Sequence, residues 1–224
     1  MGIATMILGD SGTGKSTSLR NLNPSNTLLI QALKKPLPFK AKGWSLCNKE
    51  NPEGTILVTD KSSSITTAIQ RTNKEIIIID DFQYILANEF MRRVLDKESG
   101  NQSFQKYNEI AKSAWDILNS CSQADNKRIY ILSHTQTDDF GKVKIKTLGK
   151  LLDEKIVLEG MVTIVLRTSI ENNNYYFSTK NNNYDTVKSP IDMFQEAKIE
   201  NDLLAVDKAI CEYYDIQQTQ PITA

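Results

Sequence analysis

Short apolar segments alternate with segments of helical periodicity along the first three quarters of the chain. The apolar segments have the length of β-strands and are rich in β-branched residues, at residues 3–8, 27–31, 55–59, 75–80, 128–133 and 161–168. Apolar residues at helical spacing lie between them, at residues 16–22, 62–71, 83–95 and 104–121. Because such an order forms right-handed crossovers, it predicts an α/β fold with a mostly parallel sheet flanked by helices.

The pattern changes in the last quarter of the chain. Asparagines at positions 172–174 tolerate the positive φ of a tight turn and precede the aromatic run 175–177, which predicts a β-hairpin. Pro190 suits the start of a helix, and apolar residues at helical spacing continue to about Tyr214. We therefore expect a core of residues 1–190, an acidic C-terminal helix of residues 191–214 packed on this core, and a flexible tail of residues 215–224.

Composition narrows the class of protein. Of the 224 residues, 40% are hydrophobic and 24% are charged, which is typical of a globular domain in water. The longest apolar run, residues 76–79, is far shorter than the roughly 20 residues that cross a bilayer, so we expect no membrane partner. Three widely spaced cysteines and one histidine argue against a disulfide framework or a zinc site. We expect a cytoplasmic protein.

A glycine-rich turn between the first strand and the first helix has the sequence of a phosphate-binding loop. Residues 9–16 read Gly-Asp-Ser-Gly-Thr-Gly-Lys-Ser and match the pattern Gly-x-x-x-x-Gly-Lys-Ser. Glycines let the backbone wrap around phosphates, so that successive N–H groups point at the anion. We expect Lys15 to bridge the β- and γ-phosphates of ATP, Ser16 to ligate Mg²⁺ and Thr17 to reach the α-phosphate. The predicted nucleotide-binding residues are Gly9, Asp10, Ser11, Gly12, Thr13, Gly14, Lys15, Ser16 and Thr17.

A second motif is the isoleucine run 76–79, which is followed by Asp80 and Asp81. An apolar strand that ends in a carboxylate is a Walker B strand, and open α/β sheets bind ligands at the carboxyl ends of their strands. We expect Asp80 to hold Mg²⁺ together with Ser16. Asp81 has two interpretations, because it either polarises the attacking water or caps the helix that begins near Gln83.

The strand at residues 128–133 ends beside His134, the single histidine of the chain. A polar side chain at this position can sense the γ-phosphate and transmit its presence to the following loop. A lone histidine is more often structural, but the position beside two nucleotide motifs favours the sensor role. The predicted catalytic residues are therefore Lys15, Asp80, Asp81 and His134.

Taken together, these motifs resemble the RecA-like branch of P-loop ATPases. Within that branch the chain resembles the small phage ATP-binding proteins of single-strand annealing and recombination, known as Sak-type proteins. The resemblance rests on residues 9–16, 76–82, 132–134 and 148–152 and covers roughly residues 1–180. It implies a RecA-like core that binds and hydrolyses ATP, assembles with itself into a ring or filament, and acts on single-stranded DNA. A single-strand-binding protein is a further candidate partner, and the expected location is the host cytoplasm if a phage encodes the chain.

One feature departs from the RecA-like pattern. Such proteins usually place a catalytic glutamate just after the second strand, whereas residues 29–33 read Leu-Ile-Gln-Ala-Leu and contain no acid. Activation of water must then depend on Asp81 or on Asp60, or no residue performs it efficiently. We therefore expect ATP hydrolysis that is slow and stimulated by DNA.

Two basic segments face the DNA in a RecA-like layout. The predicted DNA contacts are Arg92 and Arg93, near Lys97, in the first segment, and Lys142, Lys144 and Lys146, near Phe140, in the second. Alternation places these last three lysines on one side of an extended segment, where they suit phosphates while an aromatic ring suits a base. The alternative is an ordinary solvated edge. Lys146 and Lys150 are also candidates for a basic finger that reaches the γ-phosphate of a neighbouring subunit.

The distribution of charge is compatible with nucleic acid as a partner, and the sequence leaves two other functions open. The 27 basic and 27 acidic residues cancel, but seven acids stand against two lysines from residue 191 onward, so residues 1–190 are mildly basic. One alternative is a nucleotide or small-molecule kinase, which usually carries an arginine-rich lid, whereas Arg92 and Arg93 form the sole adjacent arginine pair here. The other alternative is a nucleotide-gated scaffold with negligible turnover.

Overall fold

The computed structural model describes residues 2–95 and 102–217. The strands are β1 Ile3–Leu8, β2 Thr27–Gln31, β3 Ile56–Val58, β4 Ile76–Asp80, β5 Arg128–Ser133, β6 Thr135–Thr137, β7 Val143–Ile145, β8 Ile164–Glu171, β9 Asn174–Ser178 and β10 Lys198–Glu200. The α-helices are α1 Ser62–Arg71, α2 Phe82–Arg92, α3 Gln102–Gln123 and α4 Leu203–Tyr213. Shorter helical turns are η1 Ser16–Asn21, η2 Pro24–Asn26, η3 Leu151–Lys155 and η4 Leu158–Met161.

Within the described residues, the main sheet has eight strands in the order β10-β9-β8-β1-β5-β4-β2-β3. The pairings from β8 through β1, β5, β4 and β2 to β3 are all parallel, whereas β8–β9 and β9–β10 are antiparallel. The predicted α/β class with a mostly parallel sheet is thereby confirmed. No helix in the described part of the chain has the length and apolar character needed to span a membrane.

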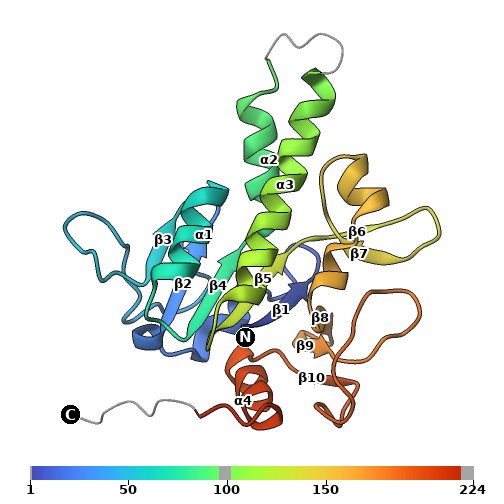
Figure 1. The fold of residues 1–224 in the computed structure, drawn as a ribbon. Helices are drawn as coiled ribbons and strands as arrows, with labels where there is room; N and C mark the ends of the chain where they lie inside the picture. Colours follow the sequence, from blue (N-terminus) through green and yellow to red (C-terminus); the bar gives the residue numbers. More distant parts are fainter. Residues whose placement is uncertain (1, 96–101, 218–224) are drawn as a thin grey trace.

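Helices cover both faces of the sheet. Figure 1 shows α1, α2 and α3 on one side of the sheet and α4 on the other. The isoleucine run of β4 explains why both faces are covered, since alternate side chains of a strand point to opposite faces. Ile77 and Ile79 pack in the cluster that includes α1 to α3, and Ile76 and Ile78 pack in the cluster that includes α4. A strand buried on both sides reads as a continuous apolar run.

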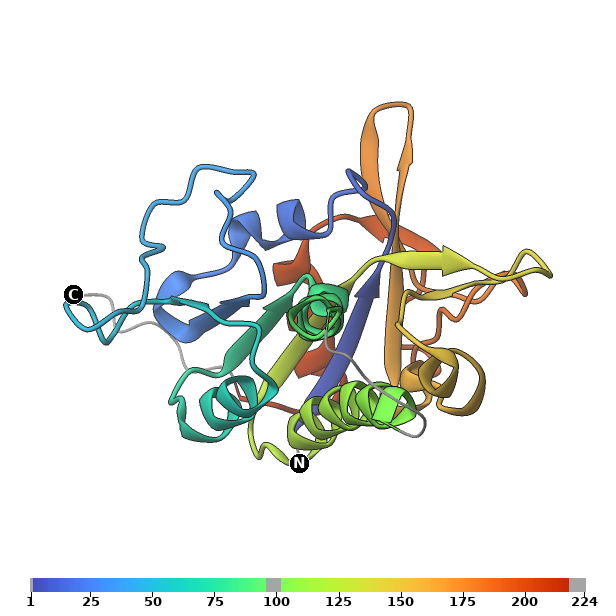
Figure 2. The same cartoon turned by 90° about the horizontal axis from the view of Figure 1, so that it is seen from above.

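The strand order places β5 between β1 and β4. Leu8 of β1 pairs with Ser133 of β5, and Ile79 of β4 pairs with Ile131 of β5. Because parallel strands end at the same edge of a sheet, the segments that follow β1, β4 and β5 meet there. Figure 2 looks down on the molecule and shows the β8–β9 hairpin and the β6–β7 pair projecting away from the sheet in different directions.

Several predicted boundaries match the structure and others shift. β1, β2, β5 and α1 occupy the predicted residues, and β3, β4 and α3 differ only at their ends. The predicted helix after the glycine-rich turn is a 3₁₀ helix, in which the Leu22 N–H donates to the Leu19 carbonyl at 3.0 Å. α2 ends at Arg92 rather than at residue 95. At its end the Arg93 N–H donates to the Phe90 carbonyl three residues earlier, as in a 3₁₀ turn.

The predicted β-hairpin is present as β8 and β9. Asn172 and Asn173 form its two-residue turn with φ angles of 50° and 62°, as a tight hairpin requires. β8 begins at Ile164 rather than at residue 161, because the residues just before it form η4.

The prediction of one long acidic helix over residues 191–214 is wrong. Asp192 has a φ of 65°, and the chain then forms β10 on the open edge of β9 before α4 begins at Leu203. The side chain of Asp202 caps this helix by accepting from the Leu204 N–H at 3.0 Å. Four of the counted acids therefore precede α4, and the helix itself contains Asp207, Lys208 and Glu212. The expected tail lies largely outside the described residues, which end at residue 217.

Candidate functional site

The loop of residues 9–15 joins β1 to η1 and has the backbone that its glycines predict. Gly12 and Gly14 have φ angles of 80° and 94°, in the region that favours glycine. A Cβ at Gly9 would clash with the hydroxyl of Thr168, so the loop packs directly against β8. The hydroxyls of Thr13 and Thr168 are 2.5 Å apart and support this contact.

The ammonium of Lys15 lies over this loop. It donates to the carbonyl oxygens of Gly9 at 2.9 Å and of Asp10 at 2.8 Å, and the residue is only 6% exposed. Burial lowers the pKa of Lys15, although the nearby carboxylates of Asp80 and Asp81 oppose this effect. The loop thus holds a buried cation against two of its own carbonyl oxygens.

Ser16 and Asp80 are brought together from positions 64 residues apart. The Ser16 hydroxyl lies 3.1 Å and 3.0 Å from the two carboxylate oxygens of Asp80, which is 1% exposed. A hydroxyl and a carboxylate suit Mg²⁺, which takes oxygen ligands and commonly completes its shell with water and phosphate. Among the described residues, no group of three or more His, Cys, Asp and Glu side chains is arranged to hold a metal without such help.

Burial raises the pKa of Asp80 to about 6, and the charge of Asp81 adds to this effect. Above pH 6 the folded and unfolded chains both carry the charge, and the folded chain bears the cost of burying it. Toward pH 4 the folded chain holds the proton and this cost disappears. Stability from this group therefore falls as the pH rises from about 4 to about 6.

We expect Asp80→Asn to raise the free energy of unfolding by about 3 kcal/mol at pH 8, because it removes the buried charge but keeps the shape. The gain should shrink steadily as the pH falls toward 4. Guanidinium unfolding at several pH values measures it, with the exposed Asp139→Asn as a control. A gain that is equal at pH 5 and pH 8 would contradict the assignment.

Asp81 directs its side chain into the site rather than capping α2. It occupies the N-cap position with φ 62° and ψ 44°, but its side chain accepts no capping hydrogen bond. A left-handed aspartate at a strand end is strained, and such strain is typical of functional sites. Its carboxylate forms an ion pair with Lys35 and lies 3.9 Å from His134 Nε2. Of the two predicted interpretations, this geometry favours the chemical one.

His134 follows β5 and faces Asp81. Its backbone N–H donates to the Gln83 side chain at 3.2 Å, and its ring packs edge-on against Tyr84. Burial lowers the pKa of His134, and the charges of Lys15, Lys35 and Lys146 add to this effect. The imidazole is therefore neutral at pH 7 and can both donate and accept a hydrogen bond.

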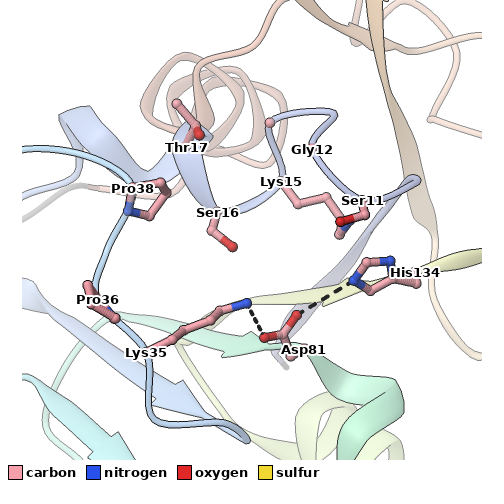
Figure 3. A pocket seen from close by; sticks show the side chains of 11 residues that line it. Ser11, Gly12, Lys15, Ser16, Thr17, Lys35, Pro36, Pro38, Asp81 and His134 are labelled. Atoms are coloured by element: carbon pink, nitrogen blue, oxygen red, sulfur yellow. Dashed lines mark ion pairs between the residues drawn. The ribbon is translucent and has the colours of Figure 1, made fainter.

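Lys15, Ser16, Asp81 and His134 line one pocket of about 250 Å³, and Asp80 contacts it through Ser16. Figure 3 shows Lys15 and Ser16 on one side of it, Asp81 and His134 on another, and Lys35 reaching toward Asp81. The lining residues are Ser11, Gly12, Gly14, Lys15, Ser16, Thr17, Lys35, Pro36, Pro38, Asp81 and His134.

Sequence reasoning missed Lys35. The sequence showed only that residues 29–33 contain no acid, whereas the structure places a lysine from the segment after β2 in the pocket. The available signal was its position, four residues beyond Gln31 at the carboxyl end of a buried parallel strand. The contribution of Gln83, which orients the backbone at His134, had no sequence signal.

The predicted basic residues of α2 are engaged elsewhere. Arg92 forms an ion pair with Asp60 at 2.7 Å, and Arg93 forms one with Glu109. Asp60 is thereby held at Arg92 and does not line the pocket, which removes it as the group that activates water. Lys97 lies outside the described residues.

The second basic segment forms the antiparallel pair β6–β7 rather than a single extended loop. Lys142 and Lys146 are exposed, whereas Lys144 is half-buried and donates to the Asp153 carbonyl at 3.1 Å. The Lys146 N–H donates to the His134 carbonyl at 2.8 Å, which places this lysine beside the site. Phe140 at the turn is 92% exposed, and Lys150 is also exposed.

Comparisons with known proteins yield a distant likeness in fold. No protein-family model and no curated protein matches the chain. A DnaB-like replicative helicase, solved in a study of its interactions with primase, is similar with a TM-score of 0.43 and 14% sequence identity. The match covers 79% of this chain and 51% of that one, so this chain spans about half the length of the helicase chain.

Proposed function

We propose that this protein binds ATP with Mg²⁺, hydrolyses it slowly, and acts on single-stranded DNA as a RecA-like ATPase. The observation that carries the proposal is the contact of Ser16, at the end of the glycine-rich loop, with the buried carboxylate of Asp80. This contact joins two motifs that the sequence alone suggests, at the edge where parallel strands bind ligands. The finer assignment is to strand annealing or recombination of the phage Sak type.

Each group in the pocket has a role in this reaction. The loop N–H groups and Lys15 bind the phosphates, and Lys15 exchanges its carbonyl partners for phosphate oxygens. Ser16 and Asp80 would hold Mg²⁺, which supplies positive charge at the transferred phosphate. Asp81 accepts the proton of the attacking water, and neutral His134 beside it senses the γ-phosphate.

Slow hydrolysis follows from the groups that are present. Asp81 is the sole carboxylate among the described residues that line the pocket, and Lys35 pairs with it. Gln31 at the end of β2 is 3% exposed and donates to the Lys35 carbonyl, so it does not replace a catalytic glutamate. A carboxylate paired with an ammonium is a weak general base, so hydrolysis has to wait until this ion pair is broken.

The pocket favours an ATPase over a kinase. A kinase lid uses arginines over the phosphates, and none lines the pocket among the described residues. Arg92 and Arg93 are held by Asp60 and Glu109 instead. The Lys35–Asp81 ion pair leaves the alternative of a nucleotide-gated scaffold open, because such a scaffold has low turnover and this ion pair weakens the base.

We propose that DNA meets the β6–β7 pair, where exposed Lys142, Lys146 and Phe140 combine cations with an aromatic ring. Lys146 also lies beside His134, so DNA at this pair has a short route to the nucleotide. Assembly into a ring or filament, in which Lys146 or Lys150 reaches the site of a neighbour, belongs to the same proposal. A single-strand-binding protein and a cytoplasmic location are consistent with it.

The test is ATP turnover with and without single-stranded DNA. We expect a low rate of ADP release that rises several-fold with a poly(dT) oligonucleotide and is lost in Lys15→Ala. Because phosphate contacts are ionic, the stimulation should weaken as salt increases. Transfer of phosphate to a nucleoside would instead identify a kinase, and nucleotide binding without turnover would identify a scaffold.

A further inference from the structure

Lys35 is a second lysine that reaches the pocket, from the side opposite the glycine-rich loop. It lies on the segment after β2, and its ammonium pairs with the Asp81 carboxylate (Figure 3). Its side chain is 41% exposed, whereas that of Asp81 is 4% exposed. Burial opposes the charge of Lys35, but the hydrogen bond to Asp81 and the charges of Asp80 and Asp81 outweigh this and raise its pKa. Lys35 is therefore a permanent cation at neutral pH.

A phosphate bound at the loop would lie between two ammonium groups. Lys15 reaches the pocket from the loop and Lys35 from the facing wall, and both line the same space of about 250 Å³. The terminal phosphate of a nucleoside triphosphate carries more negative charge than a carboxylate and presents three oxygens. Lys35 consequently has two competing anions, Asp81 and that phosphate.

We propose that Lys35 leaves Asp81 for the terminal phosphate of a bound nucleoside triphosphate, and that this exchange frees Asp81 to accept a proton from the attacking water. The proposal rests on the proposed function, since it concerns the same nucleotide site. It assigns Lys35 as a phosphate-binding residue that distinguishes triphosphate from diphosphate. It also assigns the Lys35–Asp81 ion pair as an inhibitory contact of the nucleotide-free protein.

The local structure lets the side chain move while the backbone stays in place. The Gln31 side chain donates to the Lys35 carbonyl at 3.2 Å. The ring of Pro36, which follows Lys35, fixes the φ angle at that position. The lysine side chain has a flexible four-carbon stem and a compact charge, which suits a change of partner. Asp81 is less mobile, because its backbone is fixed at the start of α2.

The exchange changes the chemistry at Asp81. While Lys35 is paired with it, the ammonium occupies the carboxylate and weakens it as a base. Once Lys35 has moved, the water oxygen bonds to the γ-phosphorus as the bond to the β,γ-bridging oxygen breaks. Asp81 takes the water proton, ADP leaves with the bridging oxygen, and phosphate release returns Lys35 to Asp81.

The test compares affinities for a non-hydrolysable ATP analogue and for ADP, both with Mg²⁺, by calorimetry. We expect Lys35→Ala to weaken binding of the analogue by about 10-fold to 100-fold and binding of ADP by less than about 2-fold. Lys35→Arg, which keeps the charge, should retain most of the preference for the analogue. Lys34→Ala serves as the control, because it removes the same charge from an exposed neighbour that does not line the pocket. Its affinities for both nucleotides should equal those of the wild type.

A double-mutant cycle tests the exchange itself. Asp81→Asn should raise affinity for the analogue more in the wild-type background, where Lys35 then has no competing carboxylate, than in the Lys35→Ala background, where only the repulsion between carboxylate and phosphate is lost. The same variant should lower turnover in both backgrounds, because the base is lost.

The outcomes separate this proposal from the proposed function. A wild-type chain that binds neither nucleotide overturns both. A wild-type chain that binds both nucleotides, with Lys35→Ala unchanged or equally weakened for the two, overturns the role of Lys35 and leaves ATP binding intact. An equal effect of Asp81→Asn with and without Lys35 overturns the exchange of partners.

Discussion

Replacing Lys15 with alanine is expected to remove detectable ATP turnover and to weaken Mg·ATP binding by about 100-fold or more. The reason is the position of the ammonium, which lies over the loop at hydrogen-bond distance from two of its carbonyls. Burial of the ammonium makes its attraction for a phosphate stronger than it is in bulk water. Calorimetry and a phosphate-release assay measure the two effects.

The fold should tolerate this change, because the folded protein bears a cost for burying Lys15 and its pKa is lowered by that burial. We expect the melting temperature of the variant to stay close to that of the wild type. Lys40→Ala, which removes a charge from an exposed position, serves as the matched control. Retention of wild-type affinity for ATP in the folded Lys15→Ala protein would rule out the loop as the phosphate site.

Replacing Asp207 with alanine is expected to destabilise the protein by about 3–5 kcal/mol. Asp207 lies on α4 and is 1% exposed, and its carboxylate accepts from Arg128 Nε at 2.7 Å and from the Tyr130 hydroxyl at 2.6 Å. Its loss leaves a buried guanidinium without this carboxylate, and the contact to Glu75 at 3.4 Å is longer. Unfolding by guanidinium chloride measures the change in the free energy of unfolding.

Two further variants separate the sources of this effect. Tyr130→Phe removes one neutral donor and should cost about 1 kcal/mol. Arg128→Met combined with Asp207→Leu replaces the ion pair with apolar side chains and should recover most of the loss from Asp207→Ala. Because Arg128 lies at the amino end of β5, opposite the end that leads to His134, ATP affinity of the folded variants should not change. A loss below about 1 kcal/mol for Asp207→Ala would show that the ion pair is not needed for stability.

The sequence-based prediction for the C-terminal segment failed at the residues that precede α4. Apolar residues at helical spacing begin before α4, but Lys198 to Glu200 pair with β9 and so complete a sheet edge. That pairing depends on the position of β9, which no local pattern contains. The acidic charge that we assigned to the helix lies mostly before it, and Asp207 within the helix is neutralised by a residue 79 positions away.

The sequence alone determined the features that depend on local chemistry. A run of four isoleucines is a strand buried on two faces, consecutive asparagines form a tight turn, and glycines at 12 and 14 allow the positive φ of the loop. Asp80 was predicted as a site residue from its place at the end of an apolar strand, and the structure places its carboxylate in contact with the Ser16 hydroxyl.

Only the tertiary structure decided which distant residues share the pocket. Strand order places β5 between β1 and β4, and thereby sets His134 beside Asp81. It also places the segment after β2 near the glycine-rich loop, so that Lys35 rather than an acid faces Asp81. The physical reason is that strand order and the paths of connecting segments follow from packing of the whole core, whereas a local pattern reports only the burial of its own residues.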